Sequence, residues 1–237
     1  MKGSADVLIL TCEHGGHDVP RELQPLFRHH TDLLHSHRGW DPGALVMARY
    51  LARELDAPLI AATVSRLVVD LNRSSRHRNL YSELTRALPD AERQHILARY
   101  YTPYRQQVEK TVARHSESGK PVLHLSVHSF TPVLNRVRRN ADIGILYDPS
   151  RTREARFARR LRAALLQEAS DLRVRCNYPY RGTADGFTTW LRRQHPAARY
   201  AGIELEINQV HSAQPAAHWT GLRRSIGRAL RAALAPE

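Results

Sequence analysis

Six short apolar segments, separated by longer amphipathic stretches, constrain the fold more than any other feature of this sequence. Short apolar runs that end at polar or glycine residues are typical of buried strands. The predicted strands cover residues 7–11, 58–64, 122–127, 143–147, 172–176 and 201–207. Apolar residues at helical spacing predict helices over residues 42–55, 90–115, 152–169 and 220–234. Strands that alternate with helices predict an α/β fold, with a mixed, mostly parallel central sheet and helices on both faces.

Two helix boundaries carry local signals. Asp41 is predicted to be the N-cap of the first helix, because Pro42 follows it at the first helical position. Pro103 interrupts the second helical pattern and predicts a kink or a break there. Two long insertions, residues 74–88 and 130–141, are expected to form the rims of a pocket.

The length of 237 residues suits one α/β domain, with two small domains as an open alternative. The first apolar run is too short for a signal peptide or a membrane span. Cys12 and Cys176 form no spacing pattern, so a disulfide framework is not expected. We therefore expect a single domain over residues 1–237, a cytoplasmic location and no membrane partner.

The formal net charge of +13 raises the question of nucleic-acid binding. Arginine accounts for 33 of the 36 basic residues, and the arginines are spread along the chain. The densest cluster, over residues 151–162, shares a helix with Phe157, Leu161 and Leu165, whose spacing marks the buried face. Apart from the buried Phe157, no aromatic residue is interleaved with this cluster to stack on bases. A solvated helix face explains the arginines, and a nucleic-acid partner is not expected.

A pair of histidines follows the first predicted strand. His14 and His17 flank two glycines, which let the backbone turn at no steric cost, so both imidazoles could converge on one point. Ligands of open α/β sheets usually bind at this place, just beyond the carboxyl end of a strand. For an isolated pair of this kind, two solvated loop histidines would be the simpler interpretation.

Polar residues also occupy two later strands. His124, Ser126 and His128 share one face of the third strand because residues two apart point the same way, and His128 lies at its carboxyl end. Glu204 and Glu206 share a face of the last strand, where burial of carboxylates is costly unless they are paired, protonated or near a metal. An exposed strand face is the alternative, and it suits Glu204 better than Glu206.

Three histidines and a carboxylate at strand ends could form a catalytic zinc site. Such a site takes three protein ligands and leaves one position for water. The metal lowers the pKa of that water to about 7, and a nearby carboxylate can accept its proton. The sequence therefore predicts Zn²⁺ as cofactor, with His14, His17 and His128 as the candidate ligands.

The segment over residues 65–74 places charged and amide groups within an apolar run, which would be unusual in a purely structural strand. An arginine such as Arg73 presents a planar fork that can grip a carboxylate with two hydrogen bonds. Asp70 could orient Arg73, or could orient a metal-bound histidine from behind. A buried structural ion pair is the alternative interpretation.

Together these segments resemble the N-formylglutamate amidohydrolase family. The resemblance lies in an ordered set of motifs that covers almost the whole chain, each weak alone. The motifs are E-H-G-G-x-x-V-P (13–20), W-D-x-G (40–43), S-R-x-V-x-D-x-N-R-S (65–74), Y-x-P-Y (101–104), V-H-S-F-x-P (127–132), N-x-P-Y (177–180) and E-x-E-I-x-Q (204–209).

This resemblance implies a zinc-dependent hydrolase with the phosphorylase/hydrolase-like fold of the carboxypeptidase A and aspartoacylase group. It implies that His14 and His128 are zinc ligands and that Glu206 is the general base. Two positions depart from the group's pattern. His17 stands where an H-x-x-E pair has glutamate, and Ser126 stands where D-L-H has aspartate.

The resemblance also implies that Asn72 and Arg73 bind the substrate, and we expect Asp70 and Tyr180 to belong to the same substrate-binding set. The resulting hypothesis is hydrolysis of a small N-acylamino acid, such as N-formyl-L-glutamate to formate and L-glutamate, with a role in histidine degradation. A zinc-activated water would attack the formyl carbon, Glu206 would accept its proton, and Arg66 would stabilise the oxyanion.

Other functions remain open at this stage. A peptidase-like amidase acting on a larger amide is the alternative within the enzyme class. A non-catalytic protein that binds a ligand or nucleic acid on the same fold is the alternative outside it. The oligomeric state is left open.

Overall fold

A six-stranded sheet forms the centre of the computed structural model, which describes residues 6–235. Its strand order is β2-β1-β3-β8-β6-β7. The strands are β1 (Val7–Cys12), β2 (Leu59–Ala61), β3 (Val122–Phe130), β6 (Ile143–Leu146), β7 (Val174–Cys176) and β8 (Tyr200–Asn208). Within the described residues, the only antiparallel pairing of this sheet is between β6 and β8. The predicted mixed, mostly parallel sheet is confirmed.

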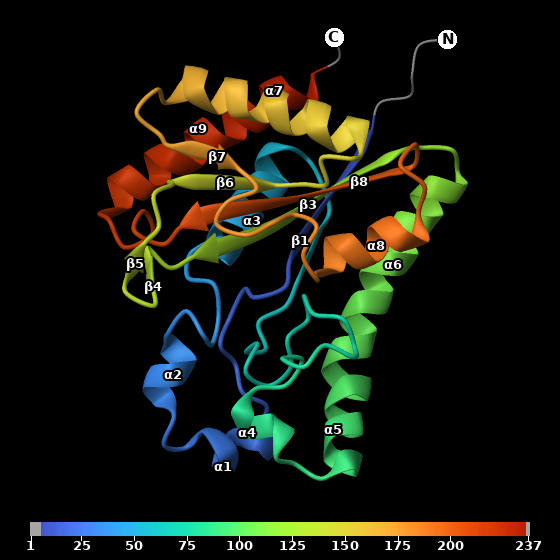
Figure 1. The fold of residues 1–237 in the computed structure, drawn as a ribbon, viewed down its shortest axis with the longest axis vertical. Coiled ribbons are helices and arrows are strands. Elements are labelled where there is room, and N and C mark those ends of the chain that lie inside the picture. The colour runs from blue at the N-terminus through green and yellow to red at the C-terminus, as the bar shows by residue number, and fades with distance from the viewer. Residues whose placement is uncertain (1–5, 236–237) are drawn as a thin grey trace.

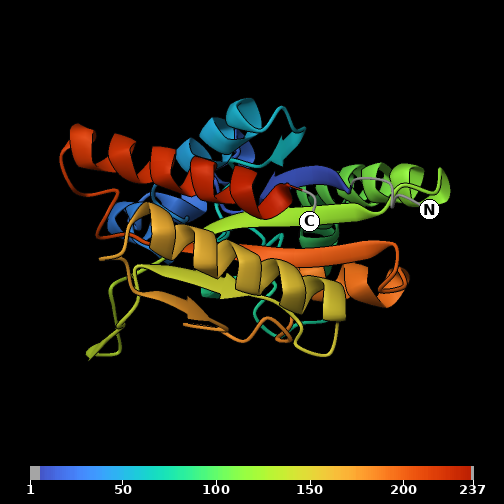
Figure 2. The ribbon, with the colours of Figure 1, turned by 90° about the horizontal axis from the view of Figure 1, so that it is seen from above.

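Helices cover both faces of the sheet, as predicted (Figure 1). The helices α3 (Ala44–Glu54), α7 (Thr152–Glu168) and α9 (Ala216–Leu234) pack on one face. Figure 2 shows α7 and α9 side by side across it. The opposite face is covered by α6 (Thr102–Glu117) and α8 (Phe187–Gln194). The inner strands β3, β6 and β8 are buried along their whole length, and β1 over its last four residues, which explains why they read as apolar runs, whereas the edge strands β2 and β7 are partly exposed.

The predicted break at Pro103 is a change of helix type. The helix α5 (Asp90–Ile96) continues through a π-helical segment, Leu97–Tyr101, directly into α6. Pro103 follows this irregular turn directly, at the place where the missing N–H of a proline prevents the regular hydrogen bond of an α-helix.

Helix α8, with eight residues, was not predicted, and neither were several shorter elements outside the central sheet. The shorter helices and strands span too few residues to show a helical or alternating pattern of their own. They are α1 (Gln24–Phe27), α2 (Thr31–His35), α4 (Glu83–Arg86), and the hairpin of β4 (Val133–Leu134) and β5 (Val137–Arg138). Figure 1 shows α1, α2 and α4 together, away from the layer of α7 and α9.

The first predicted helix starts later than expected. Gly43 precedes α3 with a φ of 84°, and the helix begins at Ala44, so Asp41 is not its N-cap. A side chain at Gly43 would also collide with Ser212. The side chain of Asp41 is therefore free to turn toward the sheet.

The carboxyl ends of β1, β3 and β8 lie at one edge of the sheet. Thr11 of β1 pairs with Ser126 of β3, and His128 of β3 pairs with Glu206 of β8. The polar residues at these strand ends therefore meet there. Both cysteines are free thiols. Among residues 6–235, no helix combines the length and the apolar character needed to cross a membrane.

Candidate active site

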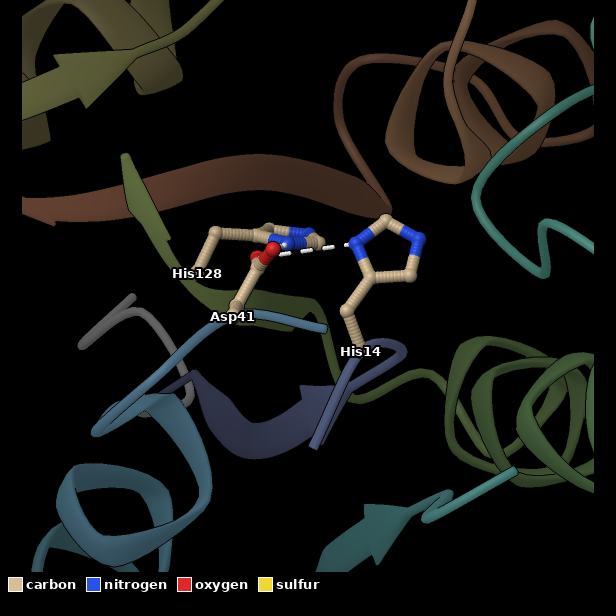
Figure 3. Close-up of side chains that lie close together, drawn as sticks. All are labelled: His14, Asp41 and His128. Atoms are coloured by element: carbon tan, nitrogen blue, oxygen red, sulfur yellow. Dashed lines mark hydrogen bonds and ion pairs between the residues drawn. The ribbon is translucent and has the colours of Figure 1, made fainter. Parts of the chain in front are cut away.

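Three buried side chains converge at this edge, as Figure 3 shows: His14, Asp41 and His128. His14 follows β1, His128 lies near the end of β3, and Asp41 comes from the loop before α3. Oδ2 of Asp41 lies 2.9 Å from Nδ1 of His128 and 3.5 Å from Nδ1 of His14. Two imidazole nitrogens and a carboxylate oxygen therefore face a common point.

His17 lies outside this group, in contrast to the expectation from the sequence. After Gly15 the chain runs beside residues 62–65, where the N–H of Asp18 donates to the carbonyl of Thr63. This path carries the His17 ring to His35 and Trp40, at centroid distances of 4.4 and 5.0 Å. Asp41 takes the place that the sequence suggested for His17.

A carboxylate holds the far side of each histidine ring. Nε2 of His14 lies 2.7 Å from Oδ1 of Asp70. Nε2 of His128 lies 3.2 Å from Oε2 of Glu13 and 2.9 Å from Oγ of Ser126, which itself donates to Glu13. When Nε2–H donates to these oxygens, the lone pair of each ring is on Nδ1.

Position 126 is a serine where the related pattern has an aspartate, and Glu13 therefore supplies the carboxylate partner of His128. Glu13 is fully buried, and Tyr104 Oη–H donates to its Oε1 over 3.0 Å. Sequence reasoning missed both Glu13 and Asp41. The signals were present, since each lies in a quoted motif, but Asp41 was interpreted as a helix cap.

The charges of the site depend on one another. Burial alone would raise the pKa of Glu13 and of Asp41. A hydrogen bond to His128 and the charge of that ring hold the pKa of Glu13 well below its usual range. The charge of His14, with hydrogen bonds to both histidines, does the same for the pKa of Asp41. Burial would lower the pKa of His128, but Asp41 and Glu13 raise it well above its usual value. The cluster of carboxylates therefore requires positive charge, which protons on the histidines or a bound cation would supply.

The donor set fits a divalent metal. Nδ1 of His14 is buried and has no hydrogen-bond partner among residues 6–235, although it points at Asp41. Two imidazole nitrogens and one carboxylate oxygen are the usual protein ligands of a catalytic zinc ion. A metal at this point would satisfy the orphan nitrogen and replace the charge of the histidine protons.

Glu206 of β8 pairs with His128 in the sheet and lines the same cavity as the three converging side chains. Burial raises its pKa to about 7, with Asp41 and Glu204 acting in the same direction and His128 opposing it. Its Oε2 is buried and has no hydrogen-bond partner in the part of the chain that the structure describes. Glu204, on the same face of the strand, accepts a hydrogen bond of 2.5 Å from Oγ1 of Thr188. The described residues therefore engage the Glu204 carboxylate but leave Oε2 of Glu206 unpaired.

The segment over residues 65–74 forms one wall. Nη2 of Arg66 donates to Oδ2 of Asp70 over 2.7 Å, and its Nη1 lies 3.5 Å from Oδ1 of Asp41. Arg73 donates from Nη1 to the carbonyl of Asp185, while its Nε lies 3.9 Å from Asp70. Asp70, predicted among the substrate-binding residues, thus contacts His14 and Arg66 most closely.

A polar cavity of about 130 Å³ lies between these walls. Its lining includes the predicted residues His14, Arg66, Asn72, Arg73, His128, Tyr180 and Glu206. Tyr180 is 45% exposed at the rim, where Arg139 from the 130–141 insertion stacks on its ring at 4.9 Å. The predicted insertion therefore reaches the rim through Arg139.

Comparison with known proteins agrees with these observations. A family model described as N-formylglutamate amidohydrolase matches residues 7–211. A gene product from Agrobacterium tumefaciens has a similar crystal structure, with 31% identity, a TM-score of 0.78, and coverage of 96% of this chain and 92% of that one. An N-formylglutamate amidohydrolase from Ralstonia eutropha JMP134 shares the fold at 20% identity, with a TM-score of 0.71 and coverage of 98% and 94%. No curated protein sequence matches this chain.

Proposed function

The chain belongs to the N-formylglutamate amidohydrolase family, and we propose that it is a metal-dependent amidohydrolase for small N-acylamino acids. The proposed reaction is hydrolysis of N-formyl-L-glutamate, or a close analogue, to formate and the amino acid. The metal would be held by Nδ1 of His14, Oδ2 of Asp41 and Nδ1 of His128.

The observation that carries the proposal is the orphan nitrogen of His14. A buried polar atom without a partner is costly, and this one faces a carboxylate oxygen and a second imidazole. When bound there, a zinc ion would polarise a carbonyl oxygen and lower the pKa of a water molecule to about 7.

Glu206 is assigned as the base. A pKa of about 7 suits a group that must take a proton and later return it near neutral pH. Its unpartnered Oε2 can accept the proton of the attacking water and deliver it to the leaving amine. Arg66 faces the same cavity, and its guanidinium would stabilise negative charge that develops on the acyl oxygen.

Arg73 and Asn72 are assigned to the carboxylate of the amino acid. Both line the cavity, and the side chain of Arg73 is about one third exposed there. A guanidinium can hold a carboxylate with two hydrogen bonds and fix the orientation of the substrate. Asp70 acts differently in this proposal, since it orients His14 and Arg66. The small, polar cavity favours a compact substrate over a large amide.

The test is a hydrolysis screen of N-acylamino acids with protein that has been stripped of metal and then supplied with Zn²⁺. We expect cleavage of small acidic substrates only with the metal, and about one zinc per chain. Longer acyl groups and peptide amides belong in the screen, because their preferential cleavage would favour a peptidase-like amidase. Absence of both hydrolysis and metal binding would refute the proposal in favour of a binding protein. Salt-dependent DNA affinity would then identify nucleic acid as its ligand.

A further inference from the structure

The Y-x-P-Y motif over residues 101–104 has no role in the chemistry above, although its first tyrosine contacts the substrate-binding segment. The hydroxyl of Tyr101 donates to the carbonyl of Arg73 over 2.8 Å. Next to the motif, Arg105 donates from Nη1 to the carbonyls of Leu71 and Arg73, each at 3.2 Å. These two carbonyls flank Asn72, so the helix fixes the backbone that carries both proposed substrate-binding side chains.

Arg105 is an unusual buried cation. It is 4% exposed and forms no salt bridge with the described residues. Its guanidinium lies 3.9 Å from the ring centroid of Phe187, with Tyr101 and Trp190 at 5.1 and 5.2 Å. Aromatic faces and carbonyl oxygens can stabilise such a charge in place of a carboxylate. The hydrogen bonds that Arg105 donates thus go to the backbone of the substrate-binding segment.

Phe187 links the same unit to Asn72. The backbone N–H of Phe187 donates to Oδ1 of Asn72 over 2.7 Å, while its ring packs against Arg105. A shift of Arg105 would therefore disturb Asn72 in two ways: through Phe187, which binds its side chain, and through the two backbone carbonyls on either side of it.

The π-helical segment explains how Tyr101 reaches this position. A five-residue step in an α-helix turns by about 500°, which places the two residues on different sides. A turn closed by a hydrogen bond between residues five apart returns the chain to nearly the same side. Ile96 and Tyr101 are five apart across this segment, and both are buried. The π-helical turn thus allows Ile96 and Tyr101 both to be buried, with the Tyr101 hydroxyl directed at the carbonyl of Arg73.

We propose that Tyr101 and Arg105 are positioning residues, which hold the backbone of Arg73 so that its guanidinium meets the carboxylate of the substrate. This inference rests on the proposed function of Arg73. It predicts that their loss impairs only substrates that carry that carboxylate.

Tyr101→Phe tests the inference, because it removes the hydroxyl and keeps the ring beside Arg105. We expect KM for an N-formylamino acid to rise about fivefold, the equivalent of one hydrogen bond of about 1 kcal/mol, with kcat little changed. KM for an N-formylamine without a carboxylate should stay constant. Arg105→Lys should show the same selectivity with a larger effect, since an ammonium lacks the fork. Tyr100→Phe is the matched control: it lies in the same π-helical segment, but its hydroxyl bonds to Glu22 at the surface.

Arg73→Lys separates this inference from its premise. If Arg73→Lys leaves the preference for the carboxylated substrate unchanged, the proposed role of Arg73 fails, and the positioning role fails with it. If Arg73→Lys removes that preference, but Tyr101→Phe and Arg105→Lys affect both substrates equally or neither, only the positioning role is overturned. The selectivity for the carboxylated substrate would then not depend on Tyr101 or Arg105.

Discussion

Replacing Glu206 with glutamine should reduce activity and increase stability at the same time. Proton transfer by a positioned side chain contributes about 10²–10⁴-fold to a rate, so kcat of Glu206→Gln should fall by a factor in that range. Metal content should not change, because Glu206 is assigned as a base and Asp41 as the carboxylate ligand. The amide has nearly the shape of the carboxyl group, so the fold should be preserved.

The expected gain in stability follows from the raised pKa. Burial moves the pKa of Glu206 from 4.5 to about 7, so the folded state of the metal-free protein resists ionisation of this group. Below pH 4.5 the carboxyl is protonated in both the folded and unfolded chains, and it imposes no penalty. The penalty grows as the pH rises to about 7 and is constant above it. At 1.36 kcal/mol per pKa unit, it amounts to about 3 kcal/mol.

Urea denaturation of metal-free protein at pH 5 and pH 8 measures this penalty. Glu206→Gln should be more stable than the parent protein at pH 8 by about 2–3 kcal/mol, with a much smaller difference at pH 5. Glu204→Gln is the matched control on the same strand face, and it should lower kcat less because Thr188 already occupies the Glu204 carboxylate. The reasoning would be refuted if the difference in stability between the parent protein and Glu206→Gln did not depend on pH. Loss of zinc from Glu206→Gln would make Glu206 a ligand instead.

Three further predictions concern individual carboxylates. Asp41→Asn should weaken Zn²⁺ binding by more than the roughly 10–100-fold typical of a residue that only orients a metal ligand, whereas His17→Ala should change it little. Calorimetric titration compares the two affinities, and equal losses would make His17 a ligand. Glu13→Gln should weaken Zn²⁺ binding by about 10–100-fold in the same assay, and unchanged affinity would show that Ser126 alone holds the His128 ring. Although burial acts in the opposite direction, hydrogen bonds from Arg173 lower the pKa of Asp142 to about 2, so Asp142 contributes stability that is lost as the pH falls from about 4 toward 2. Asp142→Asn should remove about 1–2 kcal/mol of the pH dependence of the unfolding free energy between pH 5 and 3, as measured by urea denaturation. An unaltered pH dependence would contradict the assignment.

The central sheet could be predicted from the sequence because its inner strands are buried on both faces. Apolar runs reveal such strands without knowledge of their neighbours, and all six occur close to the predicted positions. The strand order and the reversal at β6 follow from packing between distant segments. Elements such as α4 and the hairpin of β4 and β5 are too short for a periodic signal.

Two residues on strands could be placed beside each other from the sequence, whereas two residues on loops could not. His128 and Glu206 follow from the two-residue period of a strand, and the register pairs them directly. The position of a loop residue depends on where the loop packs, so sequence spacing gave His17 and Asp41 the wrong places. The glycines that suggested convergence of His14 and His17 instead send the chain along residues 62–65.

The division of labour among the acids of the site is also a property of the fold. The sequence presents Glu13, Asp41, Asp70 and Glu206 as equivalent carboxylates. In the structure, three of them contact histidine or arginine groups that hold their pKa values low, so they remain charged and suit metal binding or ring orientation. No described residue forms such a hydrogen bond with Oε2 of Glu206, and burial raises its pKa to about 7. Environments that push the pKa values of neighbouring carboxyls apart separate their roles, and only the partners that folding brings together create that difference.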